Sequence, residues 1–273
     1  MPRINHPSYF ATWLKEFGQV FKTIGDHDSG NISYGVKNKE SKKYFIKFAP
    51  CQNRTAIKFL ENAYILGKNI SHPILVELKF GVNCRDGLAL VYDWVEGENL
   101  NEVTTTNKPV IREIREAPGS PYSRFKSLPV EEIVKVLSQI FDLHVILEKQ
   151  GYVSCDWYDG CIIYNFAEEK VHIIDLDLYN KGAFTNSKGW MYGSSRFMAP
   201  EEFEPGGIID NRTTVYHMGA TIFEFLGRGK KEVEKGFRGS RAQLKIALKA
   251  IQDDKKERYC SVQDFFSEWL AAL

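Results

Sequence analysis

The sequence predicts an α+β fold in two lobes, a β-rich N-terminal lobe over about residues 1–95 and a helical C-terminal lobe over about residues 96–273. Short apolar runs separated by Gly and Asp turn signals dominate the first part. Apolar residues at helical spacing dominate the second part. A chain of 273 residues is long enough for one large domain of two lobes, and we expect a single domain.

The first lobe begins with a predicted short helix over residues 8–17. Strands are predicted at residues 20–23, 32–37, 43–48, 74–80 and 88–94. Between the third and fourth strands, the apolar spacing predicts a helix over residues 55–68. The face that this helix would bury consists of Ile57, Leu60, Tyr64 and Ile65.

The second lobe begins with a polar, proline-containing stretch, residues 101–128, which we interpret as a connecting segment with a short helix around residues 110–116. Pro129 then starts a strong helix that has acids in its first turn and ends before Gly151. The stretch 214–226 is almost uniformly apolar, which predicts a helix buried on all sides. Further helices are predicted at residues 241–251 and 262–273.

The composition is ordinary for a soluble protein, with 43% apolar and 26% charged residues. The net charge of +1 gives no global field that would favour nucleic acid or a membrane. The apolar runs are shorter than the ~20 residues of a membrane span, and the N-terminus lacks a signal-peptide core. We therefore expect a cytoplasmic protein without nucleic-acid or membrane partners. The five cysteines are unpatterned, which predicts reduced thiols rather than disulfides or a zinc site.

Two aspartates, Asp156 and Asp175, lie beside short apolar runs that predict buried strands. Residues 165–170 between these runs predict a hairpin turn, which would bring the two acids to one end of the same sheet. One carboxylate could then orient a nucleophilic hydroxyl while the other holds a metal. That pairing is the centre of a phosphoryl-transfer site.

The N-terminal lobe offers two features that suit a phosphate. Gly25 and Gly30 lie in a loop between two predicted strands, where glycine lets backbone N–H groups approach an anion. An ordinary hairpin turn is the alternative, because a glycine spacing alone is a weak motif. Lys47 ends an apolar strand, which is unusual unless the lysine pairs with an acid or a phosphate. A surface lysine with its stem on apolar neighbours is the alternative.

The order of these elements resembles a eukaryotic-like protein kinase over most of the chain. The most specific block is Gly-Ser-Ser-Arg-Phe-Met-Ala-Pro-Glu at residues 193–201. It looks like the Ala-Pro-Glu segment that closes the activation loop of Ser/Thr kinases. Residues 216–219 resemble the Trp-Ser-x-Gly core helix of the family. By the same resemblance, Arg258 should form a structural ion pair with Glu201.

The resemblance implies a serine/threonine kinase that uses ATP and Mg²⁺ and acts on a protein substrate, whose identity the motifs do not specify. Asp156 would orient the acceptor hydroxyl and take its proton, and Lys47 would hold the α- and β-phosphates. Asp175 would bind Mg²⁺. The residues implied to contact the nucleotide or to support that contact are Gly25, Gly30, Ile32, Lys47, Glu61 as the helix partner of Lys47 (with Asn62 as the alternative alignment), and the backbones of Asp93 and Val95.

Several positions depart from the family pattern. Phe45 replaces a small residue that leaves space over the adenine, and Tyr158 replaces a lysine of the catalytic loop. Thr214 replaces an aspartate that normally braces this loop. Cys161 stands where an asparagine normally binds the second metal, and a thiol is a poor ligand for Mg²⁺. We hypothesise that Asp177 supplies the missing oxygen, the alternative being that Asp177 caps the following turn.

These departures leave two other functions open. The first is a pseudokinase, a scaffold that binds a nucleotide or a partner with little catalysis, which Phe45, Tyr158 and Cys161 favour. The second is a small-molecule kinase of the aminoglycoside or choline type, which the Asp-x-Asp pattern at residues 175–177 resembles. The block at residues 193–201 favours a protein kinase over that second group.

Overall fold

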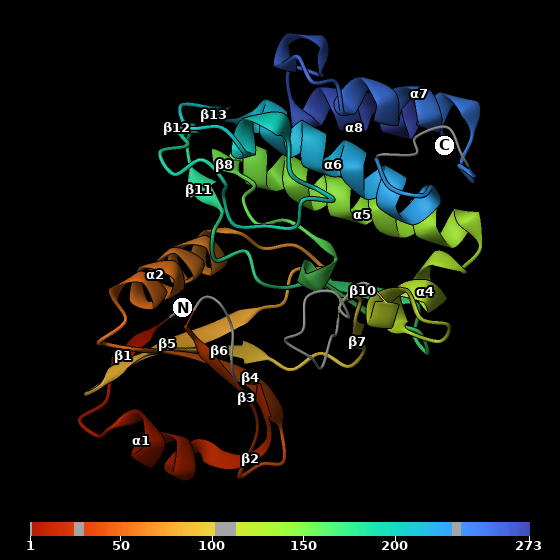
Figure 1. Cartoon of the computed structure of the whole chain (residues 1–273). Helices are drawn as coiled ribbons and strands as arrows, with labels where there is room; N and C mark the ends of the chain where they lie inside the picture. The colour runs from red at the N-terminus through yellow and green to blue at the C-terminus, as the bar shows by residue number, and fades with distance from the viewer. Residues whose placement is uncertain (1, 25–29, 102–112, 231–235) are drawn as a thin grey trace. The chain divides into compact units, whose positions relative to one another are not determined.

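The computed structural model describes residues 2–24, 30–101, 113–230 and 236–273. The chain divides into two compact units, Met1–Glu96 and Gly97–Leu273, each of which is described by itself. The first unit carries a six-stranded sheet and the second is mainly helical (Figure 1). The predicted α+β fold class with a β-rich and an α-helical lobe is therefore confirmed.

One mixed sheet forms the centre of the N-terminal unit, with the strand order β1-β5-β6-β4-β3-β2. Its strands are β1 (Arg3–Asn5), β2 (Gly18–Ile24), β3 (Ile32–Asn38), β4 (Lys43–Pro50), β5 (Leu78–Cys84) and β6 (Gly87–Asp93). The edge strand β1 runs parallel to β5, whereas the other neighbours pair antiparallel.

Two helices pack on opposite faces of this sheet, α1 (Phe10–Phe17) and α2 (Arg54–Asn69) (Figure 1). The cluster on the α1 side is Phe10, Trp13, Leu14, Val36, Ile46, Phe48, Val82, Ala89 and Val91. The cluster on the α2 side is Ala49, Ala56, Leu60, Ala63, Leu78, Leu88 and Leu90. Because successive side chains of a strand point to opposite faces, Lys47 lies on the α2 side, between Ile46 and Phe48 on the α1 side.

Two sequence predictions in this unit need correction. The strand predicted at residues 74–80 begins at Leu78, because the chain first closes a turn in which the Leu75 N–H donates to the His72 carbonyl. Pro73 inside that turn favours such a chain reversal. Ile65 does not join the buried face of α2 and is 52% exposed, since Ala56, Leu60 and Ala63 fill the face toward the sheet.

The described part of the C-terminal unit contains four long helices that lie side by side (Figure 1). They are α5 (Val130–Lys149), α6 (Asn211–Leu226), α7 (Arg241–Ala250) and α8 (Val262–Ala271). Helix α6 contacts the other three, and every residue from 213 to 226 is buried, which confirms the helix predicted to be buried on all sides. Helix α5 starts after Pro129, as predicted, and its apolar residues Ile133, Val136, Leu137, Ile140, Leu143 and Leu147 are buried.

Short elements complete this unit around the long helices. The hairpin of β9 (Ile162–Asn165) and β10 (Lys170–Ile173) pairs with β7 (Glu98–Asn99). Further short elements are β8 (Tyr152–Val153), η1 (Asp159–Cys161), β11 (Asn180–Lys181), β12 (Phe184–Thr185), η2 (Pro200–Glu202), β13 (Ile208–Ile209) and η3 (Lys255–Glu257).

The connecting segment before α5 is more ordered than its composition suggested. The short helix predicted around residues 110–116 is helical at residues 113–116, and residues 110–112 lie outside the described residues. A further helix, α4 (Pro121–Lys126), has its proline in the first turn and a Ser120 hydroxyl that accepts from the Ser123 N–H. Both features favour a helix start, and the sequence analysis missed them.

Candidate functional site

The β9–β10 hairpin places Asp156 and Asp175 around one buried side chain, that of Cys161. The strands pair Ile162 with Ile173, and the Ile174 N–H donates to the Cys161 carbonyl. The Cys161 Sγ lies 3.5 Å from the main-chain oxygen of Asp156 and 4.0 Å from that of Asp175. The hairpin therefore brings the main chains of the two acids together, as the sequence pattern predicted.

Both acids have a left-handed backbone conformation, with φ of 57° at Asp156 and 61° at Asp175. This region is sparsely populated by residues other than glycine, although aspartate tolerates it better than most. Such conformations persist only where the surroundings hold them, and they concentrate at functional sites. The shared strain marks these two positions as candidates for chemistry.

The Cys161 thiol is fully buried. Burial, together with the negative charges of Asp175 and Asp156, raises its pKa well above the ordinary value. The side chain is therefore a neutral S–H donor, which is a poor ligand for a hard cation.

Asp175 and Asp177 are the acids that could hold Mg²⁺. The side chain of Asp175 is exposed, whereas Asp177 is buried. Among the described residues, no group of three or more His, Cys, Asp or Glu side chains is placed to hold a metal ion by itself. Two carboxylates suit Mg²⁺ only when substrate phosphates and water complete its octahedral shell.

In the N-terminal unit, Lys47 is only 8% exposed and lies opposite Ser33 of β3 and Leu90 of β6. Gly30 has a φ of +69°, and a side chain there would clash with the amide of Asn53, which caps α2. The positive φ favours glycine here, and a larger residue would also have to displace the Asn53 side chain. Gly25, the other predicted loop glycine, lies outside the described residues.

Ile32 lies directly opposite Phe48, whose ring belongs to the cluster on the α1 side. Directly opposed residues share a face of the sheet, so Ile32 and Lys47 lie on opposite faces. This strand register therefore does not support the predicted contact between Ile32 and a nucleotide that Lys47 holds. The residues of β3 that share the face of Lys47 are Ser33 and Gly35.

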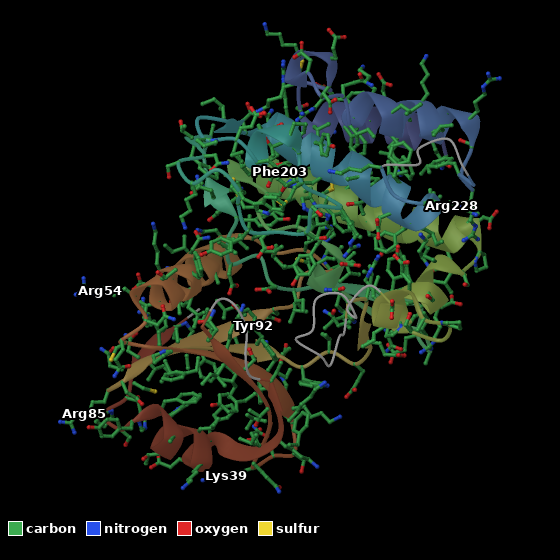
Figure 2. All side chains as sticks on the ribbon, in the orientation of Figure 1. Lys39, Arg54, Arg85, Tyr92, Phe203 and Arg228 are labelled. Carbon is green, nitrogen blue, oxygen red and sulfur yellow. The ribbon has the colours of Figure 1, made fainter. Side chains whose placement is uncertain are left out.

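Aromatic rings crowd this same face. A side chain at Gly35 would meet the rings of Phe21 and Trp94, which pack edge to face with centroids 4.9 Å apart. Phe45 lies opposite Tyr92, with ring centroids 6.3 Å apart. Figure 2 shows Tyr92 on the sheet, whereas Lys39 and Arg85 project from the edges of the unit. Large rings thus lie on the face of the sheet that carries Lys47.

Glu61 is engaged by another cation, since its carboxylate lies 3.5 Å from the Arg3 guanidinium of β1. Its side chain is half exposed, whereas Asn62 is partly buried. The pairing of Glu61 with Lys47 stays a prediction, with Asn62 as its alternative.

The last two predicted nucleotide contacts lie at the end of β6. The Asp93 N–H donates to the Glu77 carbonyl, and its carboxylate lies 3.0 Å from Lys42 and 3.3 Å from Lys79. Val95 follows as a partly buried residue. Their backbone contacts to a nucleotide stay predictions.

A buried network of four charges ties η1 to the segment before η2 and to α6. Arg196 contacts Asp159 at 2.7 Å and Glu224 at 2.6 Å. Arg115 contacts the same two acids at 3.2 and 2.8 Å. The Tyr122 hydroxyl donates to Glu224 at 2.7 Å. The sequence analysis missed this network, although a glutamate within an otherwise apolar helix is a signal for a buried partner.

The ion pair expected between Arg258 and Glu201 is present, with two contacts of 2.8 and 3.0 Å between buried groups. A second buried system, also missed, joins Ser154, His217 and Glu202. The Ser154 Oγ lies 2.5 Å from His217 Nδ1, and His217 Nε2 lies 2.6 Å from a Glu202 oxygen. Both systems fix the segment around residues 199–202.

In the comparison with protein families, the model of the protein tyrosine and serine/threonine kinases matches residues 16–263. The chain belongs to this kinase family. The comparison with curated proteins found no match. Membership supports ATP binding and phosphoryl transfer in general terms, and it covers enzymes that act on tyrosine as well as on serine or threonine.

Within this kinase domain, Asp156, Tyr158 and Cys161 belong to one short loop. Burial raises the pKa of the Tyr158 hydroxyl above its ordinary value, so the side chain is neutral where the family carries a lysine. The Tyr158 ring lies against Gly160, where an added side chain would clash with it. Of the described residues, no helix is long and apolar enough to cross a membrane, and the cytoplasmic location stays a prediction.

Proposed function

We propose that this kinase domain transfers the γ-phosphoryl group of Mg-ATP to a serine or threonine hydroxyl of a protein, with the two units acting as the lobes of one domain. The observation that carries the proposal is the convergence of Asp156 and Asp175 on Cys161. One acid orients the acceptor and the other holds a metal, which is the division of labour that phosphoryl transfer needs.

Each residue has a separate part in the proposal. Asp156 orients the acceptor hydroxyl and receives its proton. Lys47, which is buried and on a strand, neutralises the α- and β-phosphates. Gly30 and the backbones of Asp93 and Val95 contact the nucleotide, with Gly25 as the first loop glycine and Gly30 as the third. The preference for serine and threonine rests on Gly193-Ser194, which resembles that class of kinase.

The metal site is proposed to use oxygen from two acids. Asp175 binds Mg²⁺, and Asp177 replaces the oxygen that Cys161 lacks. The neutral, buried thiol supports this assignment, because it leaves a ligand position unfilled. When bound, Mg²⁺ would neutralise charge on the phosphates.

The rival function is a pseudokinase scaffold. The rings of Phe21, Phe45, Tyr92 and Trp94 favour it, since they crowd the face of the sheet that carries Lys47. An adenine base needs space beside this lysine, and large rings reduce that space. The two functions differ in turnover rather than in fold.

A phosphoryl-transfer assay separates the possibilities. The full chain is incubated with labelled Mg-ATP and with serine, threonine and tyrosine peptide libraries, and separately with small amino alcohols. Asp156→Asn and Asp175→Asn should each lower transfer at least about 100-fold. Asp264→Asn, which removes an exposed carboxylate from α8, is the matched control and should keep full activity.

Each other outcome points elsewhere. Label on tyrosine peptides alone would contradict the serine/threonine assignment. Nucleotide binding without transfer would support the scaffold, and transfer to small alcohols alone would support a small-molecule kinase.

A further inference from the structure

Ser154, two residues before Asp156, is tied to α6 at two points. Its N–H donates to the Thr214 Oγ1 at 3.0 Å, and its hydroxyl oxygen lies 2.5 Å from His217 Nδ1. Ser154, Thr214 and His217 are all buried, at 1%, 3% and 1% exposure. The two α6 residues are three positions apart, so they lie on one face of the helix.

The residue after Asp156 is tied to the same helix. The Trp157 Nε1–H donates to the Thr221 Oγ1 at 2.9 Å. Thr214, His217 and Thr221 follow the i, i+3, i+7 spacing of one helix face. The chain on both sides of Asp156 is therefore bonded to one line of polar groups on α6.

The imidazole of His217 also connects this loop to the end of the segment 193–202. Its Nε2 lies 2.6 Å from the Glu202 Oε2, which accepts from the Ala199 N–H at 2.7 Å as well. Glu202 is fully buried. Because a carboxylate only accepts, His217 donates from Nε2 to Glu202, and with one ring proton its Nδ1 accepts a hydrogen bond from the Ser154 hydroxyl.

A hydroxyl, an imidazole and a carboxylate in this order also form the triad of nucleophilic hydrolases. Here Ser154, His217 and Glu202 are each at most 1% exposed, so no substrate reaches the serine oxygen. The same bonds can fix geometry without reacting. The arrangement is thus suited to positioning.

We propose that Thr214, His217 and Glu202 are positioning residues that hold Ser154 and thereby orient the strained backbone of Asp156. This inference rests on the proposed function of Asp156. Thr214 offers a hydroxyl oxygen where the kinase resemblance places a bracing aspartate, and the His217–Glu202 pair adds a second anchor. A left-handed aspartate persists only when its surroundings over-determine it, which these bonds provide.

We call the bonds of Thr214, His217 and Glu202 that hold Ser154 the brace. Because Glu202 lies at the end of the segment 193–202, a movement of that end would disturb the brace. If this end moves, Glu202 leaves His217, and the bond between His217 and the Ser154 hydroxyl is weakened, while Ser154 keeps its bonds to Thr214 and Tyr179. The backbone around Asp156 is then held by the bonds to Thr214, Thr221 and Cys161. Phosphoryl transfer should fall while nucleotide binding is retained.

Four variants of the full chain test the brace. Thr214→Val removes the acceptor at nearly constant volume, Thr214→Ser keeps it, and Glu202→Gln weakens the bond to His217. Ser138→Ala is the control, because it deletes a hydroxyl of α5 that bonds Trp269 and the Val134 carbonyl. The measurements are kcat, the KM for ATP, the melting temperature, and hydrogen exchange of amides 153–157 without nucleotide.

We expect Thr214→Val and Glu202→Gln to lower kcat about tenfold, the size of one lost hydrogen bond, with the KM for ATP within about twofold. Thr214→Ser should restore kcat, and exchange at amides 153–157 should accelerate only in the first two variants. If Thr214→Val accelerates exchange without lowering kcat, or if Ser138→Ala lowers kcat equally at the same melting temperature, the positioning role is overturned.

The exchange measurement keeps this test separate from that of the proposed function. If the wild type transfers no phosphoryl group, the proposed activity fails, and exchange at amides 153–157 still decides whether the brace exists. Unchanged exchange in Thr214→Val overturns the brace whether or not the wild type is active.

Discussion

Arg258 donates to both carboxylate oxygens of Glu201, at 2.8 and 3.0 Å, across 57 positions of the chain. Glu201 also accepts from the Thr213 hydroxyl at 2.8 Å and lies 3.6 Å from the Lys255 ammonium. The arginine and the glutamate are both buried. This buried ion pair therefore anchors η2 to the turn around η3.

Replacing one partner of this ion pair should lower the free energy of unfolding more than replacing both partners. Arg258→Met leaves a buried carboxylate without its main partner and should cost about 3–5 kcal/mol of unfolding free energy. Arg258→Met with Glu201→Met should cost less, because no buried charge is left. Denaturant unfolding measures both, with Lys256→Met on the exposed side of η3 as the control. Equal losses in the single and double variants would contradict this account.

The same pair predicts a pH dependence of stability. Burial alone would raise the pKa of Glu201, but the bonds and the charge of Arg258 outweigh it, so the pKa lies below the ordinary 4.5. A carboxylate with a depressed folded pKa stabilises the fold above its unfolded pKa, and this contribution is lost as the pH falls through the folded pKa. The difference in melting temperature between wild type and Glu201→Gln should be constant above pH about 5.5 and shrink below pH 4.5. A difference that grows on acidification would refute the assignment.

Arg196 should be essential to the stability of the buried charge network. Its replacement by methionine leaves Asp159 and Glu224 with Arg115 as their remaining arginine partner. Burial already raises the pKa of Asp159, so the loss of a cation should add about 3 kcal/mol of destabilisation. Urea unfolding checks this, with the exposed Arg241→Met of α7 as the control. A loss no larger than that of Arg241→Met would show that Arg115 suffices.

How far the sequence predicts this molecule depends on the kind of interaction. Helices α5 and α6 follow from apolar spacing, because burial of one face or of all faces leaves a direct pattern in the residues. The Arg258–Glu201 pair followed from resemblance to the kinase family. For the network of Arg196, Asp159 and Glu224, the sequence signals only that Glu224 needs a buried partner. The partners themselves could not be predicted, since they lie on elements far apart in the chain.

Strand register explains the uncertainty in the N-terminal half of the site. Ile32 follows Gly30 by two positions, which is the spacing that its match to the kinase glycine loop is based on. In the sheet, however, Ile32 pairs with Phe48 and lies on the face opposite Lys47. A shift of one residue moves a side chain to the other face of a sheet, and no local pattern fixes such a shift here. Glu61 shows the same limit for α2, because its partner Arg3 comes from an edge strand that the pattern did not predict.

Phe45→Ala should strengthen nucleotide binding if the ring occupies space that the base needs. Phe45 and Tyr92 lie opposite each other on the face of Lys47, and removal of one ring opens that face. We expect the Kd for Mg-ATP to fall about tenfold, equivalent to about 1.4 kcal/mol. Titration calorimetry measures it, with Tyr44→Ala on the opposite face as the control. Weaker binding by Phe45→Ala than by Tyr44→Ala would indicate that the ring stacks on the base instead.

Cys161→Asn should lower the Mg²⁺ concentration needed for half-maximal transfer, because it returns an oxygen ligand to the loop. Asp177→Asn in the wild-type background should raise that concentration severalfold, and in Cys161→Asn the same change should matter less. A Mg²⁺ titration of the transfer rate measures all four chains, with melting temperatures to confirm folding. If Asp177→Asn leaves the Mg²⁺ requirement of the wild type unchanged, Asp177 caps a turn and does not serve the metal.

The family match begins at residue 16, inside α1, although the fold of the N-terminal unit begins earlier. Phe10 stacks on Phe48 with ring centroids 3.9 Å apart, and Trp13 and Leu14 are buried beside it. A fragment cut at the family boundary would lose these side chains together with the edge strand β1. Its sheet would expose an aromatic surface to water and should aggregate during preparation. A fragment defined by the family match alone would therefore be insoluble although the longer chain is stable. Expression of this kinase domain should include its first fifteen residues.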